Sequence, residues 1–295
     1  MSSELRVSVP IASPRRRKSL MNLAAKVLSY LLLCGIALLV ILPFYWMFLT
    51  SILPISEVYS TSVTWLPRRL DLSAYVSAFS SEALPFARLF LNSVVVSTSV
   101  TTLQVITSSM AAYSLARLRY PGRDTLFLVY LSTLMIPVQV TMIPTFLVLR
   151  WLGWVDTYAG LILPAAFSPF GVFLLRQYFL TLPYELEDAA RIDGASFVQI
   201  YWSIIMPLSG PAITALVIFT FLAQWNEFLW PLIVTNKIER FTLSIGLQYF
   251  RGLEFAQWPE LMAISLVSML PVLIVFLVQQ RRFVQGIALT GLTGR

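Results

Sequence analysis

The stretch PYELEDAARIDGASFVQIYWSIIMPLSGPA, residues 183–212, is the most polar thirty-residue segment in the second half of the chain. It lies between two apolar runs, each long enough to cross a bilayer. Four acids fall within nine of its residues: Glu185, Glu187, Asp188 and Asp193. Acids are favoured in the first turns of a helix, where the helix dipole is positive. The segment is therefore predicted to fold as helix outside the membrane.

Two short helices are predicted within this segment. The pair Asp193-Gly194 ends the first helix, because Gly194 can adopt the left-handed conformation. Ser196, followed three residues later by Gln199, is a capping box that starts the second. Two interpretations of the first helix compete. It is either an amphipathic surface helix with its own Glu187–Arg191 ion pair, or an element presented to a partner protein. Its Leu186, Ala189 and Ala190 share one small apolar face.

The composition places the rest of the chain in a membrane. Of the 295 residues, 58% are hydrophobic and 12% charged, and the mean hydropathy is +0.78. Several windows of about 20 residues carry almost no charge and can span roughly 30 Å of hydrocarbon. The apolar runs are continuous rather than alternating, which favours helices over a β-barrel. An all-α polytopic membrane protein of six transmembrane helices is predicted, with spans at 27–50, 88–116, 125–149, 158–180, 208–234 and 260–280.

These spans divide the chain into a cytoplasmic N-terminal tail, 1–25, and a transmembrane domain, 26–295, whose polar segment 181–207 follows the fourth span. Pro137 and Pro144 predict a kink or a break in the third span. The second span is rich in serine and threonine, a composition that either packs helices closely or lines a wet path. The run WNE at 225–227 interrupts the fifth span.

The charge distribution predicts the orientation. The net charge of +7 could indicate nucleic-acid binding, but the basic residues flank apolar spans. With the N-terminus inside, the cytoplasmic segments carry fourteen of the 21 Lys and Arg residues, and the external segments carry seven. This twofold bias follows the positive-inside rule and predicts that both termini are cytoplasmic. No histidine and a single cysteine, Cys34, argue against a zinc or Cys–His catalytic site.

Several strings resemble a known family. EDAARIDGAS at 187–196 and IMPL at 205–208 resemble the EAA loop of ABC-importer permeases, most closely the sugar permeases of the MalG type. AAYSLAR at 111–117 and GWVDTYAG at 153–160 are also similar to this family. One departure is Asp188, where the family usually has Glu before the Ala-Ala pair. The resemblance implies a coupling loop that docks in a cleft of an ATPase, through Glu187, Asp188, Ala189, Ala190, Asp193, Gly194 and Pro207.

The chain lacks the means to hydrolyse ATP itself. No G-x-x-x-x-G-K-[ST] string occurs, and none of the three lysines follows a glycine. No cofactor is therefore expected on this chain, and ATP and Mg are expected on a partner ATPase subunit. The C-terminal end, with Thr290, Gly291 and Thr293, resembles the family's tail, which reaches into the ATPase dimer. The alternative for this end is a frayed polar terminus.

A second candidate site lies within the fifth span. A carboxylate in an apolar span usually faces a cavity or a partner, so Glu227 with Trp225 and Asn226 is predicted to border the substrate path. Gln104 in the second span and Gln139 in the third are predicted companions. The alternative is that Glu227 caps or hydrogen-bonds a neighbouring span near the external interface. A tryptophan beside an amide and a carboxylate suits a sugar.

The sequence is thus interpreted as a permease subunit of an ABC importer in the bacterial plasma membrane. It would carry an oligosaccharide, disaccharide, polyol or glycerol phosphate. The resemblance implies a second permease, two copies of the ATPase and an external solute-binding protein as partners, besides membrane lipid and without nucleic acid. One rival is an ion-coupled secondary transporter with Glu227 as ion site, but no inverted repeat was found. Another is a scaffold, against which the polar second span and the proline-broken third span argue.

Overall fold

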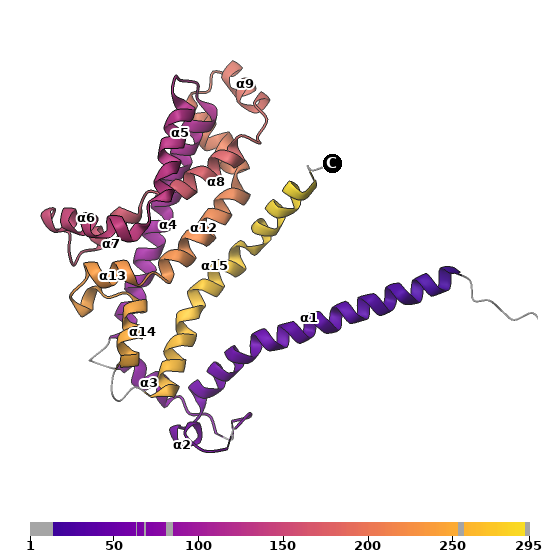
Figure 1. Cartoon of the computed structure of the whole chain (residues 1–295), viewed down its shortest axis with the longest axis vertical. Helices are drawn as coiled ribbons and strands as arrows, with labels where there is room; N and C mark the ends of the chain where they lie inside the picture. Colours follow the sequence, from indigo (N-terminus) through magenta and orange to yellow (C-terminus); the bar gives the residue numbers. More distant parts are fainter. Residues whose placement is uncertain (1–13, 63, 68, 81–84, 253–256, 293–295) are drawn as a thin grey trace, which may run out of the picture.

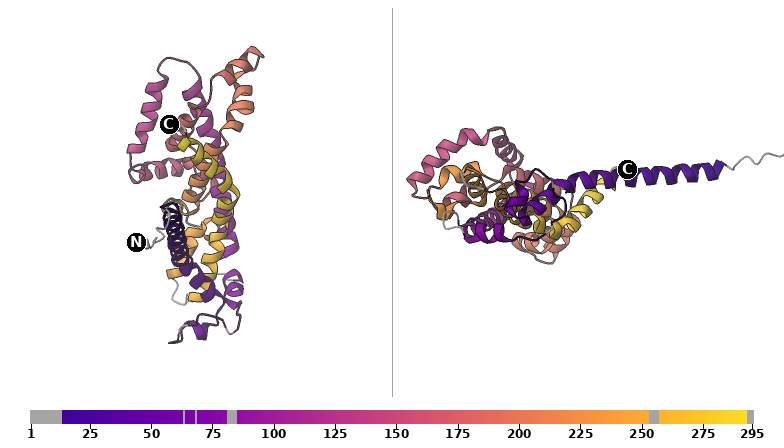
Figure 2. Two further views of the ribbon diagram at one scale, coloured as in Figure 1. Left: turned by 90° about the vertical axis from the view of Figure 1, so that its right-hand side faces the viewer. Right: turned by 90° about the horizontal axis from the view of Figure 1, so that it is seen from below.

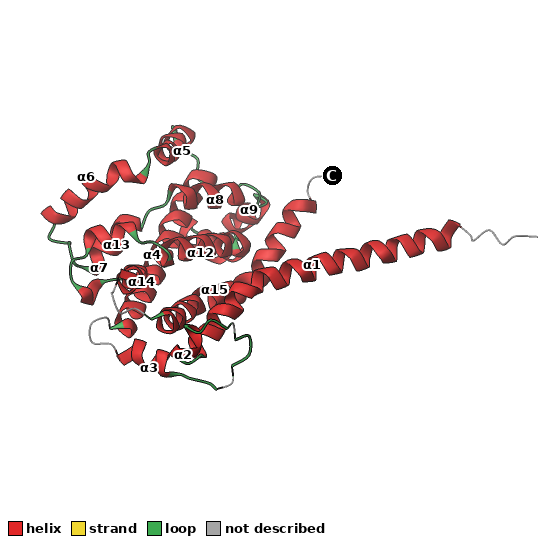
Figure 3. Ribbon diagram, turned by 60° about the horizontal axis from the view of Figure 1, so that its bottom comes forward, coloured by secondary structure: helices red, strands yellow, loops and turns green. Residues whose placement is uncertain are grey.

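The computed structural model describes residues 14–62, 64–67, 69–80, 85–252 and 257–292 (Figure 1). These residues form helices joined by turns and loops, with no strand among them (Figure 3). Three helices are long and apolar enough to cross a membrane, and up to six spans result if each of three bent helix pairs counts as one. The all-helical membrane fold predicted from the composition is confirmed.

The first span is part of a longer helix than predicted. Helix α1 (Pro14–Ile52) begins within the predicted tail and continues without interruption through Pro43. It extends away from the other helices and approaches α15 (Trp258–Leu292) only toward its own C-terminal end (Figures 1 and 2). The membrane-crossing part, Ala25–Ile52, is mostly exposed as far as Phe48, and its last four residues are buried. Two short helices, α2 (Ile55–Val58) and α3 (Ser73–Ser80), follow in the predicted external loop.

Helix α4 (Phe86–Arg117) is the centre of the fold. It packs against α8 (Pro169–Phe179) and α12 (Gly210–Trp225), which lie along its length (Figure 1). A Cβ atom placed on Gly171 of α8 would lie 2.5 Å from Ser108 Oγ of α4. The absence of a side chain at Gly171 thus lets these helix backbones approach closely, which is the packing role expected of small residues in membranes.

The third span is broken, as the prolines predict. Helix α5 (Arg123–Ser132) passes into a 3₁₀ turn, η1 (Thr133–Met135), and α6 (Val138–Trp151) then leaves at 97°. The break falls at Pro137, whereas Pro144 lies inside α6. Proline cannot donate a backbone hydrogen bond, so the ladder ends there. The kink or break predicted for the span 125–149 is therefore present, at Pro137.

The fourth span is also bent. Helix α7 (Tyr158–Ile162) and the 3₁₀ turn η2 (Leu163–Ala165) precede α8 at an angle of 42°. The hydroxyl oxygens of Thr157 and Ser168 cap α7 and α8 by accepting backbone N–H groups of Gly160 and Gly171. Before α7, Asp156 adopts φ 59° and accepts the backbone N–H groups of Asn236 and Lys237, which joins the loop before α7 to the loop after α13.

The fifth span follows a polar elbow and is interrupted as predicted. Helix α9 (Glu185–Ile192), α10 (Phe197–Ile200), the π-helical turn η3 (Tyr201–Ile205) and α11 (Met206–Leu208) lead to α12. The chain bends by 77° on entering α12, and residues 226–228 separate α12 from α13 (Leu229–Val234). The 3₁₀ turn η4 (Ile238–Arg240) and α14 (Leu243–Gly252) complete the chain before α15.

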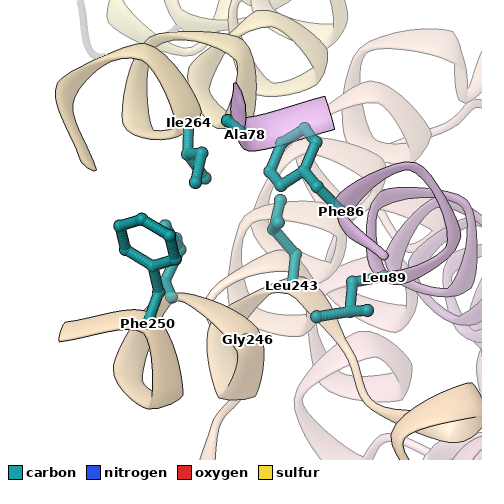
Figure 4. A pocket seen from close by; sticks show the side chains of 8 residues that line it. Ala78, Phe86, Leu89, Leu243, Gly246, Phe250 and Ile264 are labelled. Carbon is teal, nitrogen blue, oxygen red and sulfur yellow. The ribbon is translucent and has the colours of Figure 1, made fainter. Parts of the chain in front are cut away.

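An apolar cluster fixes α14 at the end of the bundle away from α9. Side chains of α3, α4, α14 and α15 converge there (Figure 4), including Ala78, Phe86, Leu243, Phe250 and Ile264. Gly246 faces Leu89, and a Cβ atom at Gly246 would collide with that leucine side chain. The cluster is core rather than a ligand site, because only a small apolar space remains between these side chains.

Candidate functional site

The elbow formed by α9, α10 and η3 protrudes at the end of the molecule where α4, α5 and α8 also meet (Figure 1). Its turn has the predicted geometry. Gly194 has φ +84°, and no atom lies within 4 Å of the place its Cβ would occupy. The capping box is present: Ser196 N donates to Gln199 Oε1 at 2.7 Å, and Gln199 N donates to Ser196 Oγ at 3.4 Å.

Glu187 points inward, away from the surface of the elbow. Its side chain is 1% exposed and its Oε1 lies 2.8 Å from Arg117 Nε, whose side chain is also buried. The predicted Glu187–Arg191 pair is present but longer, at 3.6 Å. Arg117 also donates from Nη2 to the Leu182 carbonyl at 2.7 Å, and its guanidinium lies over the Tyr184 ring. Sequence spacing cannot reveal Arg117 as partner, because the two charges lie on separate elements.

The environment of Glu187 shifts its acidity. Burial raises the pKa of the Glu187 carboxyl, and this exceeds the lowering that Arg117 and Arg191 cause. Burial disfavours the charged form because the carboxylate loses its water, while nearby cations favour it. The carboxyl therefore binds a proton more readily than an exposed glutamate does.

The outer surface of the elbow is apolar and acidic together. Ile192 is 86% exposed and Val198 66% exposed, and Leu186 and Phe197 are also exposed. Glu185, Asp188 and Asp193 lie among them with exposed side chains. The predicted Leu186–Ala189–Ala190 face is divided: Leu186 and Ala189 face outward, and Ala190 packs half-buried on the core. We call Leu186, Ile192, Phe197 and Val198 with these three acids the elbow surface.

Pro207 lies where the elbow joins α12. It is exposed within α11, directly after the π-helical turn. Ser209 N donates to the carbonyls of Ile205 and Met206, which closes the elbow before the bend into α12. Pro207 thus takes part in the shape of the junction rather than in the elbow surface.

Two of the predicted path residues have structural roles. Trp225 is 6% exposed, donates its indole N–H to the Ser268 carbonyl at 3.0 Å and stacks on Phe221. Glu227 Oε1 accepts the backbone N–H of Trp230 at 3.1 Å, at the start of α13. This is the capping role weighed as the alternative for Glu227. Asn226 is exposed and donates to the Leu222 carbonyl.

The two glutamines lie apart from this group. Gln104 donates to the Ala165 carbonyl at 2.7 Å and accepts from Thr220 Oγ1 at 3.0 Å, so it joins α4, η2 and α12. Gln139 is exposed on α6. Among the described residues, no hydrogen bond links either glutamine to Trp225, Asn226 or Glu227. Trp225 and Asn226 instead line a groove between α12, α14 and α15, together with Ser244, Ser265 and Ser268.

The residues of the predicted C-terminal contact lie at the end of the described part of the chain. Thr290 and Gly291 belong to α15, whose backbone continues to Leu292, but their side chains lie outside the described residues, as does Thr293 altogether. Within the part of the chain that is described, no three His, Cys, Asp or Glu side chains gather as a metal site would require.

Comparisons with known proteins agree on one family. The family described as binding-protein-dependent transport system inner membrane component matches residues 104–289. The arabinooligosaccharides transport system permease protein AraQ of Halalkalibacterium halodurans is 38% identical over 273 residues, covering 91% of this chain and 98% of that protein. The sn-glycerol-3-phosphate transport system permease protein UgpE of Escherichia coli is 36% identical over 263 residues, covering 87% and 93%.

A solved structure extends the likeness to the fold. The crystal structure of a bacterial ABC transporter involved in the import of the acidic polysaccharide alginate contains a chain with TM-score 0.79 and 26% identity. The match covers 93% of this chain and 100% of that one. These matches agree with the similarity of the elbow sequence to the EAA loop of ABC-importer permeases, and with the pattern of up to six spans. The chain belongs to the binding-protein-dependent transport system inner membrane components, as a multi-pass permease subunit of an ABC transporter.

Proposed function

We propose that this permease carries a carbohydrate or a related polyol phosphate into the cytoplasm. Relatives at 36% to 38% identity are named for arabinooligosaccharides and sn-glycerol-3-phosphate, and the similar structure belongs to an alginate importer. Each of these substrates carries more than one hydroxyl group, and they differ in size and charge. The proposed assembly pairs this chain with a second permease, two copies of a cytoplasmic ATPase that binds Mg and ATP, and an external solute-binding protein. Both termini of this chain then lie in the cytoplasm.

The elbow surface is the observation that supports coupling to a separate ATPase. Large exposed apolar side chains such as Ile192 and Val198 indicate an interaction site when they gather on one protruding element. Hydrocarbon is an unsuitable partner, because Glu185, Asp188 and Asp193 lie among them, and charges are costly in the bilayer. A cleft in a soluble protein, with apolar walls and basic residues at its edge, fits this surface.

The mechanism assigned to this chain is mechanical. Closure of the ATPase pair would move the docked elbow, and the spans would exchange an inward-open for an outward-open arrangement. The ATPase can shift the equilibrium between the inward-open and outward-open arrangements only if its closed form binds one of them more tightly than the other. The bends before α8 and α12 and the break at Pro137 provide joints within this part of the bundle.

Docking is tested by placing a charge in the elbow surface. Ile192→Asp should abolish co-purification of the ATPase with the permease from detergent-solubilised membranes, while the permease still accumulates there. The matched control is Val76→Asp on α3, where the side chain is 67% exposed at the far end of the molecule. If Ile192→Asp retains the ATPase as wild type does, the elbow surface is not the docking site.

We further infer that Asn226 and Glu227 border the substrate path and that Trp225 forms part of its wall. The groove beside Asn226 supports this inference, because serine hydroxyls and an amide line it together with apolar side chains. Asn226→Leu should impair uptake more than Glu227→Gln, since leucine removes both donor and acceptor. Uptake kinetics paired with co-purification of the ATPase provide the measurement. Normal uptake kinetics in both variants, or loss of assembly with the ATPase, would contradict this inference and leave these residues with structural roles only, in packing and in capping α13.

A further inference from the structure

The C-terminal end of α4 is where the elbow attaches to the membrane-crossing part of the protein. The last carbonyls of a helix lack partners within it, and cations are favoured near them. Here Arg176 of α8 donates to the Leu115 carbonyl at 3.1 Å, and Tyr184 donates to the Ala116 carbonyl at 3.4 Å. Arg117, the last residue of α4, reaches in the other direction, toward the elbow.

Arg117 holds the elbow at two points. Its Nη2 donates to the Leu182 carbonyl before α9, and its Nε lies 2.8 Å from Glu187 within α9. The guanidinium also lies 4.1 Å from the centre of the Tyr184 ring, between these points in the sequence. Arginine is suited to this role because its planar, rigid group can bind several acceptors at fixed angles. Two attachment points restrict both the translation and the rotation of α9 relative to α4.

The remaining polar attachment of the elbow also leads to α4. Tyr201 in the π-helical turn shares a 2.7 Å hydrogen bond with Ser109, and both lie buried. Among the described residues, every long-range hydrogen bond or ion pair made by residues 181–205 has its partner on α4. The long-range polar contacts of α9, α10 and η3 among the described residues therefore lead to one spanning helix, whereas α11 accepts a hydrogen bond from Tyr178 of α8 at the Leu208 carbonyl.

A buried ion pair is poor evidence for stability, because well-packed apolar residues of similar volume often stabilise a fold equally well. Apolar contacts are not directional, however, so an apolar pair would not fix the orientation of α9 relative to α4. We propose that Arg117 is a positioning residue that locks α9 to the end of α4, so that the docked elbow and α4 move as one body. This proposal rests on the proposed function, since it concerns how the motion of a docked ATPase reaches the spans.

The test measures the distance between the two elements in the complete transporter. In a Cys34→Ala background, spin labels at Met110→Cys on α4 and at Pro183→Cys, directly before α9, report their separation. Both native side chains are exposed, and neither belongs to the elbow surface. We expect the same single distance in the nucleotide-free and nucleotide-bound forms. In the double variant Arg117→Met with Glu187→Leu, which removes both charges together, we expect the distance to shift or broaden between the two forms, and transport per ATP hydrolysed to fall.

The matched control is Asp124→Asn, which removes the ion pair between Asp124 and Arg176 at the same end of the molecule without touching the elbow. It should leave the distance and the transport ratio unchanged. The proposal would be overturned if the double variant kept both the wild-type distance and the wild-type amount of transport per ATP hydrolysed. It would also be overturned if the distance in the labelled protein without these two substitutions changed between the nucleotide-free and nucleotide-bound forms.

A conservative variant covers the case in which the double variant does not assemble. Arg117→Lys keeps the charge beside Glu187 but cannot hold both Glu187 and the Leu182 carbonyl in the same geometry. It should assemble and show a broadened distance, and an unchanged distance would again overturn the proposal. Failure of the proposed function is distinguishable, because the ATPase would then remain bound to the Ile192→Asp variant whatever the distances show.

Discussion

At the scale of single residues, Glu187 and Arg117 illustrate how a buried charge depends on its partner. Both side chains are nearly inaccessible to water, and the atoms at 2.8 Å form an ion pair rather than aligned hydrogen bonds. Removing one member of such a pair costs about 3–5 kcal/mol, because the other charge remains buried alone. Substitutions that neutralise Arg117 alone should therefore destabilise the elbow far more than substitutions of Asp188 on its surface.

The acidity of Glu187 gives a pH prediction. Burial raises the pKa of the Glu187 carboxyl above the ordinary 4.5, although Arg117 and Arg191 oppose this. In the pH window between 4.5 and the raised pKa, the folded chain therefore holds a proton on Glu187 that the unfolded chain has released. The stability that this carboxyl contributes is present below the window and falls as pH rises through it. Glu187→Gln lacks this dependence, so its unfolding midpoint relative to that of wild type should rise as the pH rises above about 4.5. The exposed Glu185→Gln is the control, and parallel curves for wild type and Glu187→Gln would contradict the shift.

At the scale of elements, the elbow depends on a turn that one residue type supplies best. Gly194 has φ +84°, and a left-handed conformation costs about 1–2 kcal/mol for other residues, with β-branched residues least tolerant. Gly194→Val combined with Asp188→Lys should insert normally, yet uptake should fall because the elbow surface is strained and its charge reversed. Gly35→Val, at an exposed glycine without positive φ, is the control. Normal uptake by the Gly194 and Asp188 double variant would refute a coupling role.

The contact of α4 with α8 offers a second prediction at this scale. Because a Cβ at Gly171 would lie 2.5 Å from Ser108 Oγ and 3.1 Å from Ser108 Cβ, Gly171→Ala should separate the helices. Overpacking of this kind typically costs about 1–3 kcal/mol. The thermal unfolding midpoint of the purified complex should fall, and Ser108→Gly in the same chain should restore part of the loss. A midpoint unchanged by Gly171→Ala would show that the contact is looser than described.

At the scale of the whole molecule, the distribution of basic residues predicts one orientation. Reporter fusions after residue 20 and at residue 295 should both report the cytoplasm, because fourteen of 21 basic residues lie in the segments placed on that side. The elbow and the end of α4 then face the cytoplasm with them. One external signal from either fusion would defeat this topology, whereas a fusion at residue 155, between α6 and α7, should report the outside.

Local patterns predicted the local features of this fold well. The capping box at Ser196, the left-handed Gly194 and the break at Pro137 each depend on a few adjacent residues, and the structure has all three. The extent of α1 beyond its predicted span was missed, because a basic segment can continue a helix outside the bilayer. The 42° bend within the span 158–180 was not predicted, since apolar length does not reveal a bend angle.

Long-range pairing could not be predicted from spacing. Glu187 was expected at the docking surface, but its partner Arg117 lies on another element, and only the packing of α9 on α4 brings them together. Gln104 and Gln139 were expected to converge because both are polar residues in spans, yet Gln104 is occupied by Ala165 and Thr220 and Gln139 is exposed. Polarity within a span indicates that a partner is required without identifying it.

The distance in sequence between Arg117 and Glu187 has a consequence for biosynthesis. About 70 residues separate the two charges, so at translation rates of ~5–20 residues per second the ribosome needs roughly 4–14 s to supply the carboxylate after the arginine. During that interval an unpaired Arg117 would be costly in hydrocarbon, so we expect it to stay at the interface and to limit the depth of the newly inserted α4. The later arrival of α9 then buries the guanidinium, so one arginine serves first as a membrane anchor for the nascent chain and afterwards as the attachment of the elbow.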